Sequence, residues 1–173
     1  DSDTDATHPG PPAVKPVVCY SLCHTPAFTV SLFVFEEGAR IPLHDHVGMC
    51  VASQILCGAC EVHAYDVAQG AGHYTALAES ASDEARVVKA RAMPVRHLTA
   101  ESPAVVLYPL SGGNLHGLRA VEGAGPLAML DVLAPPYDFE RGRPCLYYEP
   151  VQKPVGNTDN NEIHTETGSD EEA

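Results

Sequence analysis

The residues most able to do chemistry are two histidines, His44 and His46, separated by one aspartate in the run Ile41-Pro42-Leu43-His44-Asp45-His46. Side chains alternate between the two faces of an extended strand, so both imidazoles are expected on one face and Asp45 on the other. Imidazole suits zinc, copper, iron and nickel. The spacing therefore predicts a pair of metal ligands, with Asp45 pointing away from the metal in a supporting or structural role.

A third histidine completes the expected site. His116 ends the run Ser111-Gly112-Gly113-Asn114-Leu115-His116. Three histidines on one side of a metal leave the opposite side open for substrate, which is typical of a catalytic site and not of a closed structural one. We therefore expect His44, His46 and His116 to hold one metal ion, although imidazole chemistry alone does not fix which metal.

Short β-strands are the elements that must position these histidines. Apolar, strand-like runs occur at residues 28–35, 49–56, 61–67, 86–93, 104–108, 116–121 and 127–133. Gly/Pro turns such as Gly112-Gly113 and Pro135-Pro136 separate several of them, and no long amphipathic helix pattern is evident. Many short strands with such punctuation predict an all-β sandwich or barrel.

The composition fits a single domain. The chain has 173 residues, of which 45% are apolar. We expect a domain over residues 15–153, a disordered tail at 1–14 and an acidic disordered tail at 154–173. Much of the formal net charge of −13 comes from the two ends, and basic residues are not clustered, which argues against a nucleic-acid partner. No apolar run is long enough to span a membrane.

Two further segments are interpreted as connections between strands. Cys57-Gly58-Ala59-Cys60 is interpreted as a tight hairpin turn between two strands, because no second Cys-x-x-Cys completes a zinc site. Residues 69–84, rich in Ala, Gly and Ser, are interpreted as an inserted loop that could form a lid. The six cysteines are expected to be reduced, which favours a cytoplasmic protein, with the nucleus as a further location.

The spacing of the histidines resembles the two motifs of the cupin fold. The residues that carry the resemblance are Gly38, His44, His46 and Gly58 for the first motif, and Gly113, Asn114, Leu115 and His116 for the second. The first motif normally has a metal-binding glutamate four or five residues after its second histidine, where this chain has Cys50 and Val51. Three neutral imidazoles leave a divalent ion its full charge, which suits an anionic thiolate in the open positions.

Longer stretches are similar to the thiol dioxygenase family that contains cysteamine (2-aminoethanethiol) dioxygenase and the plant cysteine oxidases. The similar stretches are residues 41–46, 107–116, 130–137 and 142–148, in the family's order. The run Leu130-Asp131-Val132-Leu133-Ala134-Pro135-Pro136-Tyr137 is the most distinctive. The resemblance implies a cupin fold, a double-stranded β-helix with jelly-roll-like strand order, that holds non-haem Fe(II) through the three histidines.

The resemblance also implies an activity. The enzyme would use O2 to oxidise a thiol to a sulfinic acid, with cysteamine or the N-terminal cysteine of a peptide or protein as substrate, and the latter reaction would suit oxygen sensing. Asp131 could hold the substrate amine, orient a histidine or move a proton, and Tyr137 could bind oxygen species or gate the pocket. Cys145 and Tyr147 match a pair that can form a thioether crosslink. We expect a monomer with no membrane partner.

Two alternatives stay open. One is a cupin enzyme that uses another metal, such as an isomerase or a different dioxygenase. The other is a non-catalytic cupin module that binds a metal and senses a small molecule. Metal analysis combined with oxygen uptake separates these from a thiol dioxygenase.

Overall fold

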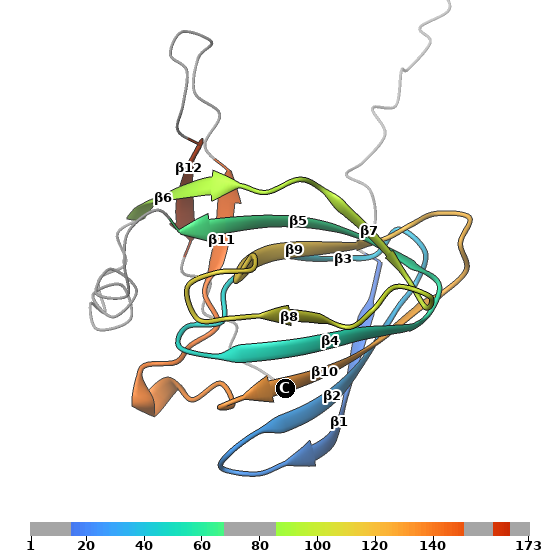
Figure 1. Ribbon diagram of the computed structural model, residues 1–173, viewed down its shortest axis with the longest axis horizontal. Coiled ribbons are helices and arrows are strands. Elements are labelled where there is room, and N and C mark those ends of the chain that lie inside the picture. The colour runs from blue at the N-terminus through green and yellow to red at the C-terminus, as the bar shows by residue number, and fades with distance from the viewer. Residues whose placement is uncertain (1–14, 68–85, 151–160, 167–173) are drawn as a thin grey trace, which may run out of the picture.

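The computed structural model describes residues 15–67, 86–150 and 161–166 (Figure 1). These residues form β-strands and one short 3-10 helix. In chain order the elements are β1 (Val17–His24), β2 (Thr29–Phe35), β3 (Arg40–His44), β4 (Cys50–Cys57), β5 (Ala59–Val67), β6 (Arg86–Ala92), β7 (Arg96–Thr99), β8 (Val105–Leu107), β9 (Leu115–Ala120), β10 (Leu127–Ala134), η1 (Phe139–Arg141), β11 (Tyr147–Pro150) and β12 (Asn161–Glu166).

The strands form two sheets that curl around a shared interior. One sheet has the order β1-β2-β10-β4-β8, and the other has the order β6-β12-β11-β3-β9-β5-β7. Early strands pair with late ones in both sheets: β2 pairs with β10 and β3 pairs with β9, all antiparallel. This order is that of a jelly roll, the arrangement used by cupins. The predicted all-β, double-stranded β-helix fold is therefore confirmed.

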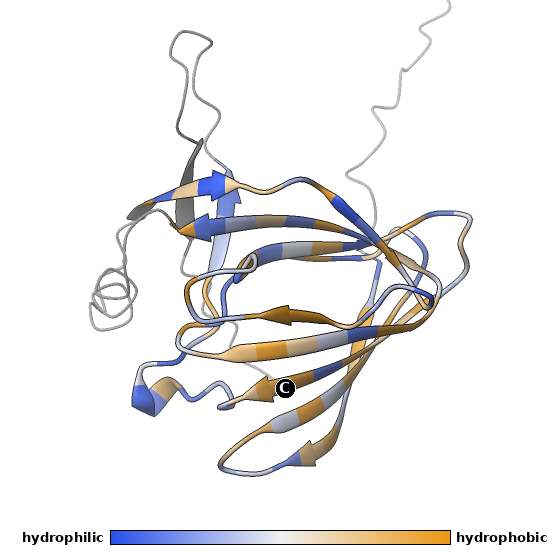
Figure 2. Cartoon of the chain, in the orientation of Figure 1, coloured by the Kyte–Doolittle hydropathy of each residue, from blue (hydrophilic) through white to orange (hydrophobic). Residues whose placement is uncertain are grey.

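Alternation along the strands fills the interior. On β10, Leu127, Met129 and Leu133 are buried and point inward. Leu127 and Met129 pack with residues such as Phe35 and Ile55, whereas Leu133 belongs to a separate cluster with Met49, Val51 and Leu107. Figure 2 shows hydrophobic residues along β4, β8 and β10 and a hydrophilic η1 at the rim. Burying each such side chain contributes roughly 1.5–3 kcal/mol. Asp131 interrupts this inward apolar row and is only 6% exposed.

The segment Cys57–Cys60 differs from the expected hairpin. Gly58 does separate two strands, but β4 and β5 belong to different sheets, so this turn is a corner at which the chain crosses between them. The φ angle of Gly58 is +73°, and a Cβ there would lie 2.6 Å from the carbonyl oxygen of Pro126. The tight corner therefore requires glycine.

The last described segment also differs from expectation. Residues 161–166 fall in the stretch expected to be a disordered acidic tail, yet they form β12, which pairs with both β11 and β6. The prediction rested on net charge, which does not report the strand neighbours available to a segment. The expected tail at 1–14 and the expected lid at 69–84 lie outside the described residues. Among the described residues, no helix has the length and apolar character needed to cross a bilayer.

Candidate metal centre

His44 and His116 lie opposite each other on neighbouring strands. His44 is the last residue of β3 and is paired in register with His116 on β9. Directly opposite residues of an antiparallel pair point to the same face, so both imidazoles enter the interior. The Nδ1 atom of His44 is 2.9 Å from the carbonyl oxygen of Pro42. Because a carbonyl only accepts, Nδ1 carries the proton, and Nε2 is left with a lone pair for a metal.

His46 reaches the same point from a different backbone position than predicted. β3 ends at His44, so His46 lies in the irregular segment after the strand and the two histidines do not share one strand. The side chain of Asn114 replaces strand pairing there. Its Oδ1 accepts a hydrogen bond from the backbone N–H of His46 at 3.1 Å, and its Nδ2 donates to the carbonyl of His46 at 3.0 Å and to that of Tyr108 at 3.0 Å.

Tyr137 fixes the ring of His46. Its hydroxyl donates to the carbonyl of Asp45 at 2.7 Å and lies 2.6 Å from Nδ1 of His46. Since the single phenolic proton is used on Asp45, Nδ1 of His46 must donate to the tyrosine oxygen. This chain of hydrogen bonds leaves Nε2 of His46 unprotonated and aimed into the cluster.

The three imidazoles converge on one point. Their ring centroids are 4.8–5.0 Å apart, and their candidate ligand nitrogens all lie within 4.8 Å of one another. The Nε2 atoms of His46 and His116 are 3.3 Å apart. Burial lowers the pKa of all three rings, that of His46 to about 3, which keeps them in the neutral form that binds metals. The geometry and protonation of this cluster fit a divalent metal ion held by three histidines.

Asp45 points away from this cluster, as predicted. Its carboxylate accepts hydrogen bonds from the backbone N–H of Leu146 at 3.1 Å and from the hydroxyl of Tyr148. It is fully buried, and burial raises its pKa to about 7. Asp45 thus ties the segment between the two histidines to β11, which supports the cluster from behind.

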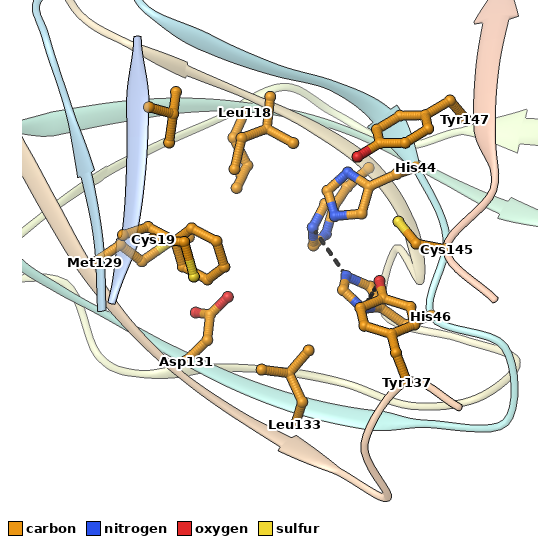
Figure 3. A pocket seen from close by; sticks show the side chains of 14 residues that line it. Cys19, His44, His46, Leu118, Met129, Asp131, Leu133, Tyr137, Cys145 and Tyr147 are labelled. Atoms are coloured by element: carbon orange, nitrogen blue, oxygen red, sulfur yellow. Dashed lines mark hydrogen bonds between the residues drawn. The ribbon is translucent and has the colours of Figure 1, made fainter. Parts of the chain in front are cut away.

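A cavity of about 380 Å³ opens in front of the histidines. Figure 3 shows Asp131 on the wall opposite the imidazoles, beside Cys19 and Met129. The Oδ1 atom of Asp131 is buried and has no hydrogen-bond partner among the described residues, and burial raises the pKa of this carboxyl to about 6. A buried, under-satisfied carboxylate facing a cavity is suited to receive a cationic or hydrogen-donating group.

The remaining predicted residues line the same cavity. Tyr137, Cys145 and Tyr147 surround the histidines on the side away from Asp131 (Figure 3). The ring centroid of Tyr147 lies 6.2 Å from that of His44, and burial raises the pKa of the Cys145 thiol. The structure therefore brings all seven predicted residues around one cavity. The thioether between Cys145 and Tyr147 stays a prediction.

Asn114 is the supporting residue that sequence reasoning missed. It is 2% exposed, and its amide joins the segment around His46 to the segment before β9. A polar residue two positions before a candidate ligand, after two glycines, was the available signal. The three contacts depend on segments up to 68 residues apart, which the local sequence does not reveal.

Comparisons with known proteins agree on a family. The PCO_ADO family model matches residues 2–171. A 2-aminoethanethiol dioxygenase from Mus musculus is 36% identical over 152 residues, which is 83% of this chain and 58% of that protein. Plant cysteine oxidase 1 from Arabidopsis thaliana is 32% identical over 133 residues, which is 77% of this chain and 41% of that protein. The chain thus spans 58% of the length of the first relative and 41% of the length of the second.

A solved structure supports the fold alone. The crystal structure of CapF with the inhibitor 3-isopropenyl-tropolone superposes with a TM-score of 0.51 at 12% identity, over 74% of this chain and 33% of that one.

Proposed function

The chain belongs to the PCO_ADO family, and we propose on this premise that it is a non-haem Fe(II) thiol dioxygenase. It would use O2 to convert a thiol to a sulfinic acid, with cysteamine or an N-terminal cysteine as substrate. The observation that carries the proposal is the three-histidine cluster, which contains no carboxylate ligand from the described part of the chain and opens to a cavity that has Asp131 on its far wall.

The proposed metal ligands are the Nε2 atoms of His44, His46 and His116. Fe(II) held there would lower the pKa of a substrate thiol, take the thiolate as a ligand and supply the electrons that activate O2. The absence of a carboxylate from the cluster preserves the full charge of a divalent ion, which favours an anionic sulfur donor. The overall change, RS⁻ plus O2 to RSO2⁻, balances without another reductant.

Asp131 is proposed to hold the substrate amine. Cysteamine and an N-terminal cysteine share a thiol and an amine on adjacent carbons, so a thiol at the histidines leaves the amine free to contact another wall. The buried Oδ1 of Asp131 faces the cavity and has no partner among the described residues. An ammonium there would satisfy this oxygen and stabilise the ionised carboxylate.

Tyr137 is proposed to orient His46 and to limit access to the cavity. Its ring stacks on His46 with centroids 5.4 Å apart while its hydroxyl contacts Nδ1 of that histidine. Burial raises the pKa of the phenol well above its ordinary value, so it remains a neutral hydrogen-bonding group. Loss of such a supporting contact typically weakens metal affinity or activity by roughly 10- to 100-fold.

Further proposals concern the setting of the reaction. The protein is proposed to act as a monomer. It is also proposed to act in a reducing compartment, the cytoplasm or the nucleus, because its six cysteines are free thiols. Because the reaction consumes O2, the amount of oxidised N-terminal cysteine would depend on the O2 concentration, as oxygen sensing requires.

Metal analysis and oxygen uptake test the proposal together. We expect the purified protein to bind one iron per chain and to consume O2 with cysteamine or a Cys-initiated peptide, while His116→Ala loses both properties. Iron-loaded protein that consumes no O2 with either thiol would refute the proposal. Retention of another metal with turnover of a non-thiol substrate would favour a different cupin enzyme, and ligand binding without turnover would favour a sensor.

A further inference from the structure

A second hollow lies directly beside the metal cavity. It has a volume of about 360 Å³. Its lining residues come from the end of β1 and the turn that follows, and from the segment after β10: His24, Thr25, Pro26, Pro136, Tyr137, Asp138, Arg141 and Arg143. Tyr137 lines both this hollow and the metal cavity. We call it the Arg141–Arg143 groove. It is separated from His46 by the ring of one tyrosine.

Both walls of the groove are held by their own hydrogen bonds. In the turn, the hydroxyl of Thr25 accepts from the backbone N–H of Phe28 at 3.0 Å and donates to its carbonyl at 2.9 Å. In the other wall, Asp138 and Arg143 exchange two backbone hydrogen bonds of 2.9 Å. A groove with such fixed walls requires little ordering when a ligand binds, which favours affinity.

The side chains that line the groove include two arginines and one aspartate, while Glu140, beside Arg141 on η1, lies outside the lining. Among the described residues that line the groove, two guanidinium groups share one carboxylate. Arg141 Nη1 and Arg143 Nη2 lie 3.2 and 3.4 Å from the same oxygen of Asp138. The side chain of Arg141 is 71% exposed, so most of its five N–H donors remain available. In a chain with a formal net charge of −13, a basic groove selects for an anionic ligand.

An exposed aromatic adds an apolar contact next to these charges. Phe139, on η1 between Asp138 and the two arginines, is 85% exposed. Exposed aromatic and arginine side chains side by side are typical of surfaces that bind peptides. Neither the Phe139 ring nor the two arginines line the metal cavity, so they have no role in the chemistry at the histidines.

We propose that the Arg141–Arg143 groove binds the residues that follow the N-terminal cysteine of a peptide substrate and selects a carboxylate among them. This inference rests on the proposed function, because the cysteine itself must occupy the metal cavity. An extended peptide advances roughly 3.3–3.6 Å per residue. Since Tyr137 lines both the metal cavity and the groove, the residues that directly follow the cysteine are the ones placed to reach the guanidinium groups.

Paired peptides test this selection. The substrates are Cys-initiated peptides that differ only by Asp or Asn at the second, third or fourth position. Their kcat/KM values are measured with wild-type protein, Arg141→Gln and Arg91→Gln. Arg91 is the matched control, because its side chain is 79% exposed and also pairs with one aspartate, Asp66, away from the groove. We expect roughly two- to five-fold higher kcat/KM for the Asp peptide at its best position, the size of a partly exposed ion pair. Arg141→Gln removes this ratio, and Arg91→Gln keeps it.

A binding measurement separates this proposal from the proposed activity. Ser-initiated versions of the same peptides cannot be oxidised, and their dissociation constants follow from fluorescence anisotropy. An Asp preference that disappears in Arg141→Gln supports the groove even if no thiol is oxidised, an outcome that would refute the proposed activity alone. Equal binding and equal kcat/KM for Asp and Asn peptides, with normal thiol oxidation, would overturn the groove and leave the activity intact.

Discussion

Asp131→Asn should stabilise the metal-free protein, and the gain should grow with pH. Burial raises the pKa of this carboxyl from its ordinary 3.8 to about 6. The folded state therefore binds the proton more tightly than the unfolded state, and wild-type stability falls as pH rises from about 4 to about 6. At about 1.4 kcal/mol per pKa unit, the penalty on the ionised wild-type protein reaches about 3 kcal/mol.

Chemical denaturation of the metal-free proteins at several pH values measures this difference. The free energy of unfolding of Asp131→Asn minus that of wild type should increase by roughly 2–3 kcal/mol between about pH 4 and about pH 8. Asp138→Asn is the control. Its carboxylate bridges two arginines, so this variant should be less stable than wild type, the opposite sign to Asp131→Asn. If the difference in unfolding free energy between Asp131→Asn and wild type did not change with pH, burial would not be raising the pKa of this carboxyl. That result would refute the reasoning.

Three further substitutions test the support of the site and the fold. Asn114→Ala should cost about 2–4 kcal/mol of unfolding free energy, because it leaves buried backbone groups of His46 unpaired, and urea denaturation checks this. Tyr137→Phe should weaken iron affinity by roughly 10-fold or more with little change in thermal stability, measured by competition with a chelator. Gly58→Ala should destabilise the fold by more than about 2 kcal/mol, seen as a lower Tm, because of its positive φ and the Pro126 carbonyl at 2.6 Å.

The strands and the histidine cluster could be predicted because their signals are local. Alternation of apolar and polar residues located most strands of the jelly roll within one to three residues, as for β2 (Thr29–Phe35) and β10 (Leu127–Ala134). The spacing of His44 and His46 suggested a shared point of convergence, although the backbone that produces it is a strand end followed by an irregular segment. A two-residue spacing brings side chains together in more than one backbone conformation.

The supporting contacts could not be predicted because they join distant parts of the chain. Asp45 meets Tyr148 across 103 residues, and Tyr137 meets His46 across 91. β12 was missed because its residues are acidic and polar, while its stability as a strand depends on pairing with β6 and β11. Likewise the groove beside Tyr137 exists only because the turn after β1 folds next to the segment after β10.

The fate of labelled oxygen tests the central claim most directly. Iron-loaded protein is given cysteamine or a Cys-initiated peptide under heavy-isotope-labelled O2, and the product is analysed by mass spectrometry. We predict a sulfinic acid that carries both labelled oxygen atoms, formed by wild-type protein and not by His116→Ala. Disulfide as the sole product, oxygen derived from water, or equal product from His116→Ala would contradict the account.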